Sequence, residues 1–327
     1  MTRVGIFGVA HVHAAGYAAK LELVDRVEVV GASETDDALR KTWAARSDTP
    51  SFGAHEALIA AGVDAAIVCT PTNEHREVVE ELADAGVHVL CEKPLATSVD
   101  DARAIVGVCA TADVLLMTAF PMRFNPALAA GAEWIGEGRI GEILAFSGAN
   151  QGRIPIDYAA WFADPIAAGG GAVMDHTVHL VDIMRWWTGA EPVEVFAEIN
   201  RIFHPDVAVE TGGIVTVGFD NEIFATIDCS WSRPDGYPAW GGLTIEALGT
   251  EGAFTVDAFA ERLDVWSRGD QAWIDWGADG DQAMIDHFIG AVRGEHSPAV
   301  TGIDGLRATE VALAAYRSVS AGQPVEV

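Results

Sequence analysis

A regular alternation of strand-like and helix-like segments over the first 120 residues limits the possible folds more than any other feature of this chain. Five short apolar runs lie at 4–8, 27–32, 65–70, 87–91 and 114–119, with helix-like patterns near 13–23, 36–46, 54–61, 74–85 and 98–111. The runs are apolar throughout, as expected of strands that helices cover on both faces of a parallel sheet. The series predicts a doubly wound α/β domain over residues 1–120.

The pattern changes beyond residue 120 and predicts a second domain over residues 121–327. Helices are expected within 123–138, from about 172 to 188 with Gly189 as the stop, and near 280–294 and 303–321. One strand is expected near 143–149, before the long helix. The strand-like runs after that helix, several of them joined by short turns, predict a mainly antiparallel meander; they lie at 193–203, 213–219, 222–230, 242–248, 252–256 and 262–266.

The charge of the chain excludes several kinds of partner. It carries 20 Lys and Arg against 48 Asp and Glu, and the net charge of −28 repels nucleic acid and anionic membranes. Concentrated salt screens such self-repulsion, because the Debye length is about 3 Å at 1 M, so we expect a salt-adapted organism. An ordinary acidic protein is the alternative. The start of the sequence has the pattern of neither a membrane span nor a signal peptide.

The cysteines indicate a reducing compartment. They have no paired or metal-like spacing, so we expect reduced core thiols in a cytoplasmic protein; the four are Cys69, Cys91, Cys109 and Cys229.

The first strand opens into the turn "GVAHVHAAGY", which predicts a dinucleotide site. Such a turn presents backbone amides and a helix N-terminus to a pyrophosphate, usually with the pattern G-x-G-x-x-G. Gly8 holds the first position, whereas Ala10 and His13 hold the other two. Glu34, after the second strand, can bind a ribose diol and would repel a 2′-phosphate, which favours NAD over NADP. His11 and His13 are expected to line the turn or cap the next helix, without a metal, because zinc needs three or four ligands.

Polar residues follow the third and fourth predicted strands. Thr70, Pro71, Asn73 and His75 come after the third, and Lys93 comes after the fourth in "VHVLCEKPLA". Ligands in open α/β sheets bind beyond the carboxyl ends of the strands, so these residues are expected at one crevice. An exposed salt bridge between Lys93 and the preceding glutamate is the structural alternative.

In the second half, "GGGAVMDHTVHLVDIMRWWTG" is apolar nearly all round, which indicates a buried helix. Asp175, His179 and Asp182 lie at i, i+4 and i+7 and share one face of it. An unpaired buried carboxylate is costly, so this stripe is expected to face partners or a ligand cleft. The alternative is a self-satisfied Asp–His pair in the core.

These segments together resemble the Gfo/Idh/MocA family of NAD(P)-dependent sugar oxidoreductases. The resemblance rests on "GVAHVH", "TPTNEH", "CEKPLA", "GGGAVMDHTVHLVD" and "PAVTGIDGLRATEVALAAYRS", and it covers essentially the whole chain. It implies an N-terminal Rossmann domain, a C-terminal α/β domain with a large open sheet, and a homodimer or homotetramer. In relatives the bond that corresponds to Lys93–Pro94 is often cis. The resemblance also implies that Lys93 and His179 are the catalytic pair and that Asp175 assists them.

The implied reaction is hydride transfer between a nicotinamide cofactor and a sugar or polyol. A hydroxyl lies between Lys93 and His179, His179 takes its proton, the carbon loses hydride, and Lys93 stabilises the developing alkoxide. The predicted cofactor residues are Gly8, Ala10, His11, Val12, His13, Glu34, Thr70, Pro71, Asn73, His75, Glu92 and Lys93. The predicted substrate residues are Arg123, Asn150, Arg153, Tyr158, Trp161 and His176.

Two other functions stay open within this resemblance. An NAD-dependent glycosidase would oxidise its sugar transiently and show no net change in cofactor. A non-enzymatic NAD-binding sensor or co-repressor would bind NAD without turnover, but it has no need for a general base such as His179.

Overall fold

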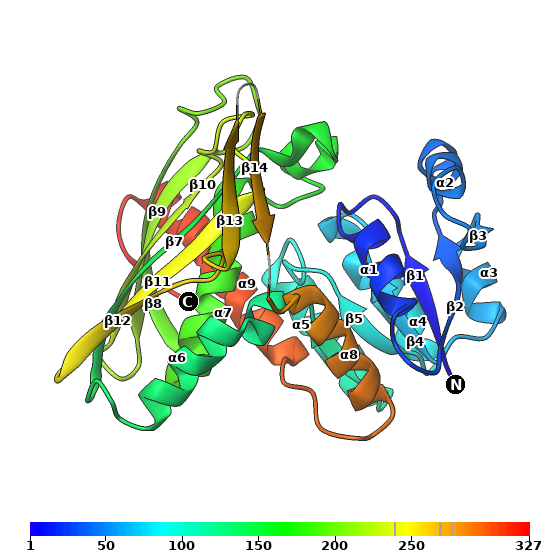
Figure 1. Cartoon of the computed structure of the whole chain (residues 1–327), viewed down its shortest axis with the longest axis horizontal. Coiled ribbons are helices and arrows are strands. Elements are labelled where there is room, and N and C mark those ends of the chain that lie inside the picture. The colour runs from blue at the N-terminus through cyan, green and yellow to red at the C-terminus, as the bar shows by residue number, and fades with distance from the viewer. Residues whose placement is uncertain (239, 268–269, 276) are drawn as a thin grey trace. The chain divides into compact units, whose positions relative to one another are not determined.

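The computed structural model describes residues 1–238, 240–267, 270–275 and 277–327, and the chain divides into two compact units (Figure 1). The first unit comprises 1–121, 156–169 and 281–306, and the second comprises 122–155, 170–280 and 307–327. The sequence predicts a single boundary near residue 120, whereas two later segments return to the first unit. Long-range hydrogen bonds explain the return, because Asn73 N–H donates to the Ala167 carbonyl (3.0 Å) and Arg293 Nε donates to Thr2 Oγ1 (3.0 Å).

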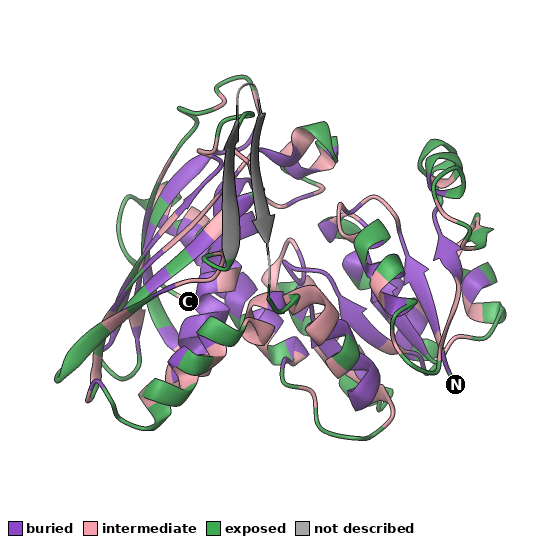
Figure 2. Ribbon diagram, in the orientation of Figure 1, coloured by how far each residue is buried: buried purple, intermediate pink, exposed green. Residues whose placement is uncertain are grey.

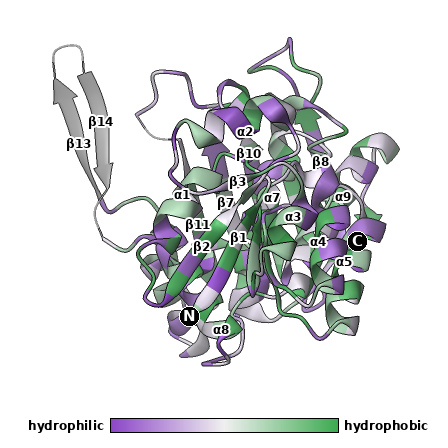
Figure 3. Cartoon of the chain, turned by 90° about the vertical axis from the view of Figure 1, so that its right-hand side faces the viewer, coloured by the Kyte–Doolittle hydropathy of each residue, from purple (hydrophilic) through white to green (hydrophobic). Residues whose placement is uncertain are grey.

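The first unit contains a six-stranded parallel sheet in the order β3-β2-β1-β4-β5-β6. Its strands are β1 (Thr2–Phe7), β2 (Val27–Ser33), β3 (Ser51–Phe52), β4 (Ala65–Val68), β5 (His88–Cys91) and β6 (Leu116–Thr118). The strands β1, β4, β5 and β6 are largely buried, as the purple ribbons in Figure 2 show, and Figure 3 shows hydrophobic stretches in β1 and β2. This is the Rossmann order, and all five predicted strands are present. The sequence missed β3 because two residues are too few to give an apolar run.

Helices connect the strands of this sheet. They are α1 (Ala14–Leu21), α2 (Asp37–Ala44), α3 (His55–Ala60), α4 (His75–Asp84), α5 (Val99–Thr111) and the short 3-10 turn η1 (Thr72–Glu74). The 3-10 turn η2 (Pro121–Phe124) follows the last strand, β6. The later segments add η3 (Pro155–Asp157), η4 (Ala160–Ala163) and α8 (Gly280–Val292). Apolar side chains of β4, β5, α4 and α5 form one core, in which Val68, Val89, Leu82 and Ile105 are fully buried.

The second unit contains a seven-stranded mixed sheet in the order β12-β11-β7-β10-β9-β8-β15. Its strands are β7 (Ile143–Gly152), β8 (Pro192–Asn200), β9 (Gly212–Phe219), β10 (Phe224–Ser230), β11 (Gly241–Gly249), β12 (Gly252–Asp257) and β15 (Val325–Glu326). The described pairs are antiparallel except for β7 with β10, so the predicted mainly antiparallel sheet is confirmed.

The predicted meander is wrong in two places, because β7 lies between β10 and β11, and because the last predicted strand joins another sheet. The run at 262–266 becomes β13 (Arg262–Ser267), which pairs with β14 (Asp270–Asp275) in a separate two-stranded sheet. The chain turns away from β12 because Ala258 N–H donates to the Leu243 carbonyl (2.9 Å), while the Ala258 carbonyl accepts from Asn125 Nδ2 (2.8 Å).

Helix α7 (Ala172–Thr188) packs against β7, β9 and β10, and α6 (Pro126–Gly136) packs against α7. Helix α9 (Gly302–Ala321) carries the chain from the first unit into the second. Gly189 ends α7 as predicted, with a φ of 66° and its N–H on the Arg185 carbonyl (2.8 Å). All four cysteines are buried and free, as expected, and no described helix is long and apolar enough to cross a membrane.

Candidate active site

The turn after β1 is built around Gly8. Its φ is 80°, and a Cβ there would lie 2.4 Å from the Thr70 side chain and 2.6 Å from the Thr70 backbone nitrogen. Its N–H donates to the Ser33 carbonyl at the end of β2 (2.8 Å). Only glycine fits this conformation and this close approach, so Gly8 makes the tight turn that a dinucleotide site requires.

Glu34 ties this turn to the end of β2. The side chain is buried, and its Oε2 accepts the Val9 N–H (2.9 Å) while Oε1 accepts the Asp36 N–H (2.9 Å). Each carboxylate oxygen offers two acceptor sites, so both can still accept a further hydrogen bond. The structure therefore fixes a carboxylate beside the turn, where the sequence predicts recognition of a ribose diol.

His11, His13 and Glu92 form a cluster between this turn and the end of β5, in which His11 and Glu92 are buried and His13 is partly exposed. Glu92 Oε1 lies 2.8 Å from His13 Nδ1 and 3.5 Å from His11 Nδ1, and Oε2 accepts the Lys93 N–H (3.0 Å). Burial would raise the pKa of Glu92, but the charge and hydrogen bond of His13, together with the Lys93 ammonium, hold that pKa well below its usual range. Burial lowers the pKa of His11 to about 3, so His11 is neutral. Burial also opposes a charge on His13, but Glu92 outweighs it and raises the pKa of His13.

The same cluster has the composition of a metal site. One ligand atom from each of the three side chains lies within 4.8 Å of the others. The hydrogen bonds favour direct pairing instead, because His13 N–H donates to His11 Nδ1 (3.3 Å) and Tyr17 Oη lies 3.2 Å from His13 Nδ1. His13 is the N-cap residue of α1, although its side chain makes no cap hydrogen bond there.

Two buried polar atoms at this edge of the sheet have no hydrogen-bond partner among the described residues. They are His11 Nε2 and Thr70 Oγ1. An unsatisfied buried polar group costs roughly 1–3 kcal/mol, so such atoms are normally paired by a ligand or by water. With the tight turn at Gly8 and the carboxylate of Glu34, these atoms fit a dinucleotide bound across the turn.

The remaining predicted cofactor residues follow β4 and β5. His75 is buried, with Nδ1 3.1 Å from the Leu95 carbonyl and Nε2 3.3 Å from the Thr70 carbonyl. Burial lowers the pKa of His75, so the neutral ring donates to one of these two carbonyls. Asn73 has an exposed side chain, and Pro71 is half-buried. Lys93 is 7% exposed, and the Lys93–Pro94 bond is cis, as the resemblance implies.

Trp161 lies against the dinucleotide turn. Its Nε1 donates to the Ala10 carbonyl (3.1 Å), and its ring stacks on Phe162 with 4.1 Å between centroids. The Phe162 ring centroid is 5.3 Å from that of His11. Trp161 was predicted to contact substrate, and no sequence signal places it on a turn 151 residues earlier in the chain. Tyr158, from the same segment, is 60% exposed.

Two distant side chains hold the first turn of α7 in the second unit. Glu210 Oε1 accepts the N–H groups of Gly171 (2.9 Å) and Val173 (3.0 Å). Tyr316 Oη accepts the Met174 N–H (3.2 Å) and donates to Glu210 Oε1 (2.8 Å). These bonds satisfy the open N–H groups of a helix start whose own N-cap, Gly171, has no side chain. The sequence analysis missed both residues, because local patterns identify caps only within a few residues of a helix.

Asp175 lies one turn inside this helix start. Its Oδ2 accepts Trp231 Nε1 (3.1 Å) and lies 3.2 Å from His176 Nε2. His179 follows one turn later on the same face and is half-buried. Trp231, just beyond β10, is a third functional residue without a sequence signal.

Asp182, the third member of the predicted stripe, pairs with Arg123. Arg123 Nε donates to Oδ2 (2.8 Å) and Nη2 donates to Oδ1 (2.6 Å), with the two side chains 8% and 1% exposed. This is a buried bidentate ion pair. The structure gives the Arg123 guanidinium this structural role, and its predicted contact with substrate stays a prediction.

Three other predicted substrate residues carry buried polar atoms with no partner in the described part of the chain. These atoms are Asn150 Oδ1, Arg153 Nε and His176 Nδ1. Asn150 Nδ2 donates to the Gly242 carbonyl (3.0 Å), which fixes the direction of its amide. A Cβ at Gly152 would lie 3.1 Å from the His176 ring, so the end of β7 and the start of α7 meet closely here. Their unsatisfied donors and acceptors suit a ligand that carries several hydroxyl groups.

Comparison with known proteins gives one consistent result. A family model described as "Oxidoreductase family, NAD-binding Rossmann fold" matches residues 2–120, and the "GFO/IDH/MocA C-terminal domain" matches residues 129–255. The chain is 28% identical to myo-inositol 2-dehydrogenase of Thermotoga maritima, over 99% of this chain and 98% of that protein. It is 28% identical to D-xylose 1-dehydrogenase (NADP(+)) 2 of Haloferax volcanii, over 92% of each. A putative myo-inositol dehydrogenase from Sinorhizobium meliloti has a similar solved structure, with a TM-score of 0.83, 25% identity and 100% of each chain covered.

Proposed function

Because the chain belongs to the Gfo/Idh/MocA family of NAD-binding oxidoreductases, we propose that it oxidises a hydroxyl carbon of a sugar, polyol or related derivative. The observation that carries this proposal lies at the junction of β7 and α7. There Asn150, Arg153 and His176 leave three buried polar atoms unsatisfied among the described residues, beside the helix that carries Asp175 and His179. A polyhydroxylated substrate supplies hydrogen-bond donors and acceptors of the kind these atoms need.

The proposed chemical roles are as follows. NAD, when bound, supplies the hydride acceptor, and Gly8, the turn amides and Glu34 hold it in the first unit. His179 takes the proton of the reacting hydroxyl, and Lys93 stabilises the alkoxide that develops as the carbon is oxidised. Asp175 is held by Trp231 Nε1 and His176 Nε2, and it orients His179 or binds a neighbouring hydroxyl.

The cofactor preference follows from Glu34. Its two oxygens are held by the N–H groups of Val9 and Asp36, so the carboxylate cannot easily turn away from a ligand at the turn. A 2′-phosphate at this position would meet a fixed negative charge, whereas a ribose diol can donate hydrogen bonds to it. We therefore propose NAD over NADP for this chain.

The direct test is a screen of the purified protein in concentrated KCl with NAD and a panel of polyols and aldoses, followed by NADH absorbance. Net NADH formation with at least one compound supports the proposed function. Cleavage of aryl glycosides without net NADH would establish the glycosidase alternative instead. NADH binding without turnover of either class would identify the non-enzymatic sensor.

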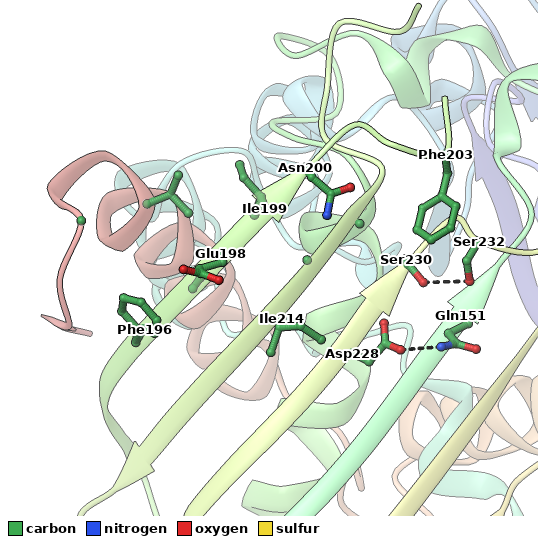
Figure 4. Close-up of a pocket in the computed structure, with 15 residues that line it drawn as sticks. Gln151, Phe196, Glu198, Ile199, Asn200, Phe203, Ile214, Asp228, Ser230 and Ser232 are labelled. Atoms are coloured by element: carbon green, nitrogen blue, oxygen red, sulfur yellow. Dashed lines mark hydrogen bonds between the residues drawn. The ribbon is translucent and has the colours of Figure 1, made fainter. Parts of the chain in front are cut away.

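We propose that the protein forms a homodimer or homotetramer through the open face of the seven-stranded sheet. The outward positions of this face carry exposed apolar side chains, with Phe196, Ile214 and Phe224 being 37%, 51% and 56% exposed. Figure 4 shows Phe196 and Ile214 beside a hollow of about 670 Å³ in which Gln151 bonds Asp228. A second copy would cover these side chains through a self-complementary contact.

Replacing Ile214 by glutamate is expected to reduce the oligomer to the monomer mass. A buried carboxylate at the centre of the contact would have to lose its water without a partner. Light scattering in concentrated KCl measures the mass, and Leu23→Glu, which changes a 76% exposed residue of the other unit, is the matched control. If the wild-type chain is a monomer, or if Ile214→Glu keeps the full oligomer mass, another surface or none forms the contact.

We also propose that the protein works in the cytoplasm of a salt-accumulating organism. Its net charge of −28 supports this, and so do its four buried free thiols. The unfolding temperature is expected to rise as KCl increases from 0.1 M to 1 M, because the Debye length falls from about 10 Å to about 3 Å and screens carboxylate repulsion. Calorimetry measures the shift, and an unfolding temperature that does not change with KCl would remove the case for salt adaptation.

A further inference from the structure

We propose that the imidazole of His13, held by the buried carboxylate of Glu92, is the cationic phosphate ligand of the dinucleotide turn and makes cofactor binding depend on one proton. This inference rests on the proposed function, because it assumes that NAD binds at this turn. The usual pattern has glycine at the third position, where His13 stands at the N-terminus of α1. A side chain at this position takes up space beside the dinucleotide turn, which favours a side chain that itself contacts the ligand.

The orientation of the ring supports such a contact. Glu92 Oε1 (2.8 Å) and Tyr17 Oη (3.2 Å) both lie at Nδ1 of His13. The opposite nitrogen, Nε2, is therefore the edge of the ring that is left for a ligand. The His13 side chain is 36% exposed, whereas that of His11 is only 2% exposed, so His13 is the histidine of the pair that a ligand can reach.

The charges around His13 favour its protonated form. Burial and the Lys93 ammonium oppose a charge on His13, as would a charged His11. Glu92 and Asp281 of α8 favour the charge, and the net effect is a raised pKa of His13. The N-terminus of α1 also opposes a cation, because the helix dipole is positive there. Glu92 is the close partner that offsets these effects, with one oxygen on the imidazole and the other on the Lys93 N–H.

An imidazolium at the start of α1 adds what the altered turn lacks. Phosphate oxygens prefer charged donors, and a charge-assisted hydrogen bond is stronger than a neutral one. The turn amides and the helix N-terminus then bind the pyrophosphate together with Nε2–H of His13. In this arrangement Glu92 is a positioning residue, because it acts on the phosphate through the imidazole.

The sign of the pH dependence follows directly. The cation is present below the raised pKa of His13 and is lost as the pH rises through it, so NADH affinity should be highest at low pH. The dissociation constant is expected to increase about tenfold or more across this range, as befits the loss of one charge-assisted hydrogen bond. The transition should lie above the usual imidazole value of 6.5.

The test is a fluorescence titration of the full chain with NADH in concentrated KCl containing EDTA, over a pH series that brackets the usual value of 6.5. His13→Gln keeps an N–H donor without the charge, and it should bind NADH weakly and with nearly the same affinity at every pH. Glu92→Gln should move the transition to lower pH, because the imidazolium loses its partner. His204→Gln, in the connection before β9, is the matched histidine control and should keep the wild-type profile.

The outcomes separate this inference from the proposed function. NADH binding that does not vary with pH in the wild-type chain overturns the role of His13 and leaves the proposed function standing. An unchanged pH profile in His13→Gln has the same meaning. No NADH binding at any pH removes the proposed function itself. If EDTA abolishes binding and zinc restores it, the cluster holds a metal ion and the proton-linked role is wrong.

Discussion

Replacing Lys93 by alanine should lower the turnover number on the true substrate by about 10²-fold or more. The reacting hydroxyl becomes an alkoxide as it loses its proton, and Lys93 is the proposed cation that stabilises this charge. Lys93 lies two residues beyond β5 and is only 7% exposed, so its ammonium acts where little water competes with it. NADH formation at saturating substrate measures the effect.

The control for this prediction separates chemistry from cofactor binding. The turn at Gly8 and the carboxylate of Glu34 are untouched in Lys93→Ala, so NADH affinity measured separately shows how much of the loss comes from the predicted cofactor contact of Lys93. Lys41→Ala, which removes a 75% exposed side chain on α2, should keep full turnover. Near-wild-type turnover in Lys93→Ala would show that another group stabilises the alkoxide.

Replacing Arg123 by methionine should lower the free energy of unfolding by about 3–5 kcal/mol. The change leaves the Asp182 carboxylate, which is 1% exposed, without the guanidinium that now pairs with both of its oxygens. Urea unfolding followed by tryptophan fluorescence measures the loss. The exposed pair of Arg139 and Glu137 supplies the matched control, since Arg139→Met should cost only about 0–1 kcal/mol.

A double variant tests the cause of this loss. Adding Asp182→Leu to Arg123→Met removes the orphaned carboxylate and should recover most of the lost stability, because two apolar side chains can pack where an ion pair stood. If the double variant is no more stable than Arg123→Met, the loss comes from packing of the arginine stem and the electrostatic account is wrong.

The sequence predicts the first sheet well because its strands are buried on both faces. Continuous apolar runs such as 65–70 and 87–91 are readily identified as buried strands in a chain where helix-like segments alternate with them. Helix α7 was equally clear, since one glycine stops a long apolar segment. The strand at 262–266 was placed in the wrong sheet, because a single run does not indicate which neighbour it will pair with.

The site could be predicted only in part. Residues in local motifs, such as Gly8 and Lys93, carry their signal within a few positions of a strand end. Glu210, Tyr316 and Trp231 carry none, because each acts on α7 from a segment far away in sequence. Trp161 was predicted from its residue type alone. Its hydrogen bond to the Ala10 carbonyl depends on the tertiary fold, which no local sequence pattern predicts.

Because the two units alternate along the chain, the protein cannot be divided into two independent fragments by a single cut. The chain passes between them at 121/122, 155/156, 169/170, 280/281 and 306/307. A fragment that stops at residue 120 would lack the segments that carry Trp161 and Arg293, and it would expose the surfaces they cover. Neither unit is therefore encoded by one continuous stretch of the gene. A chimaera with another member of the family has to exchange three segments, because a single crossover would split both cores.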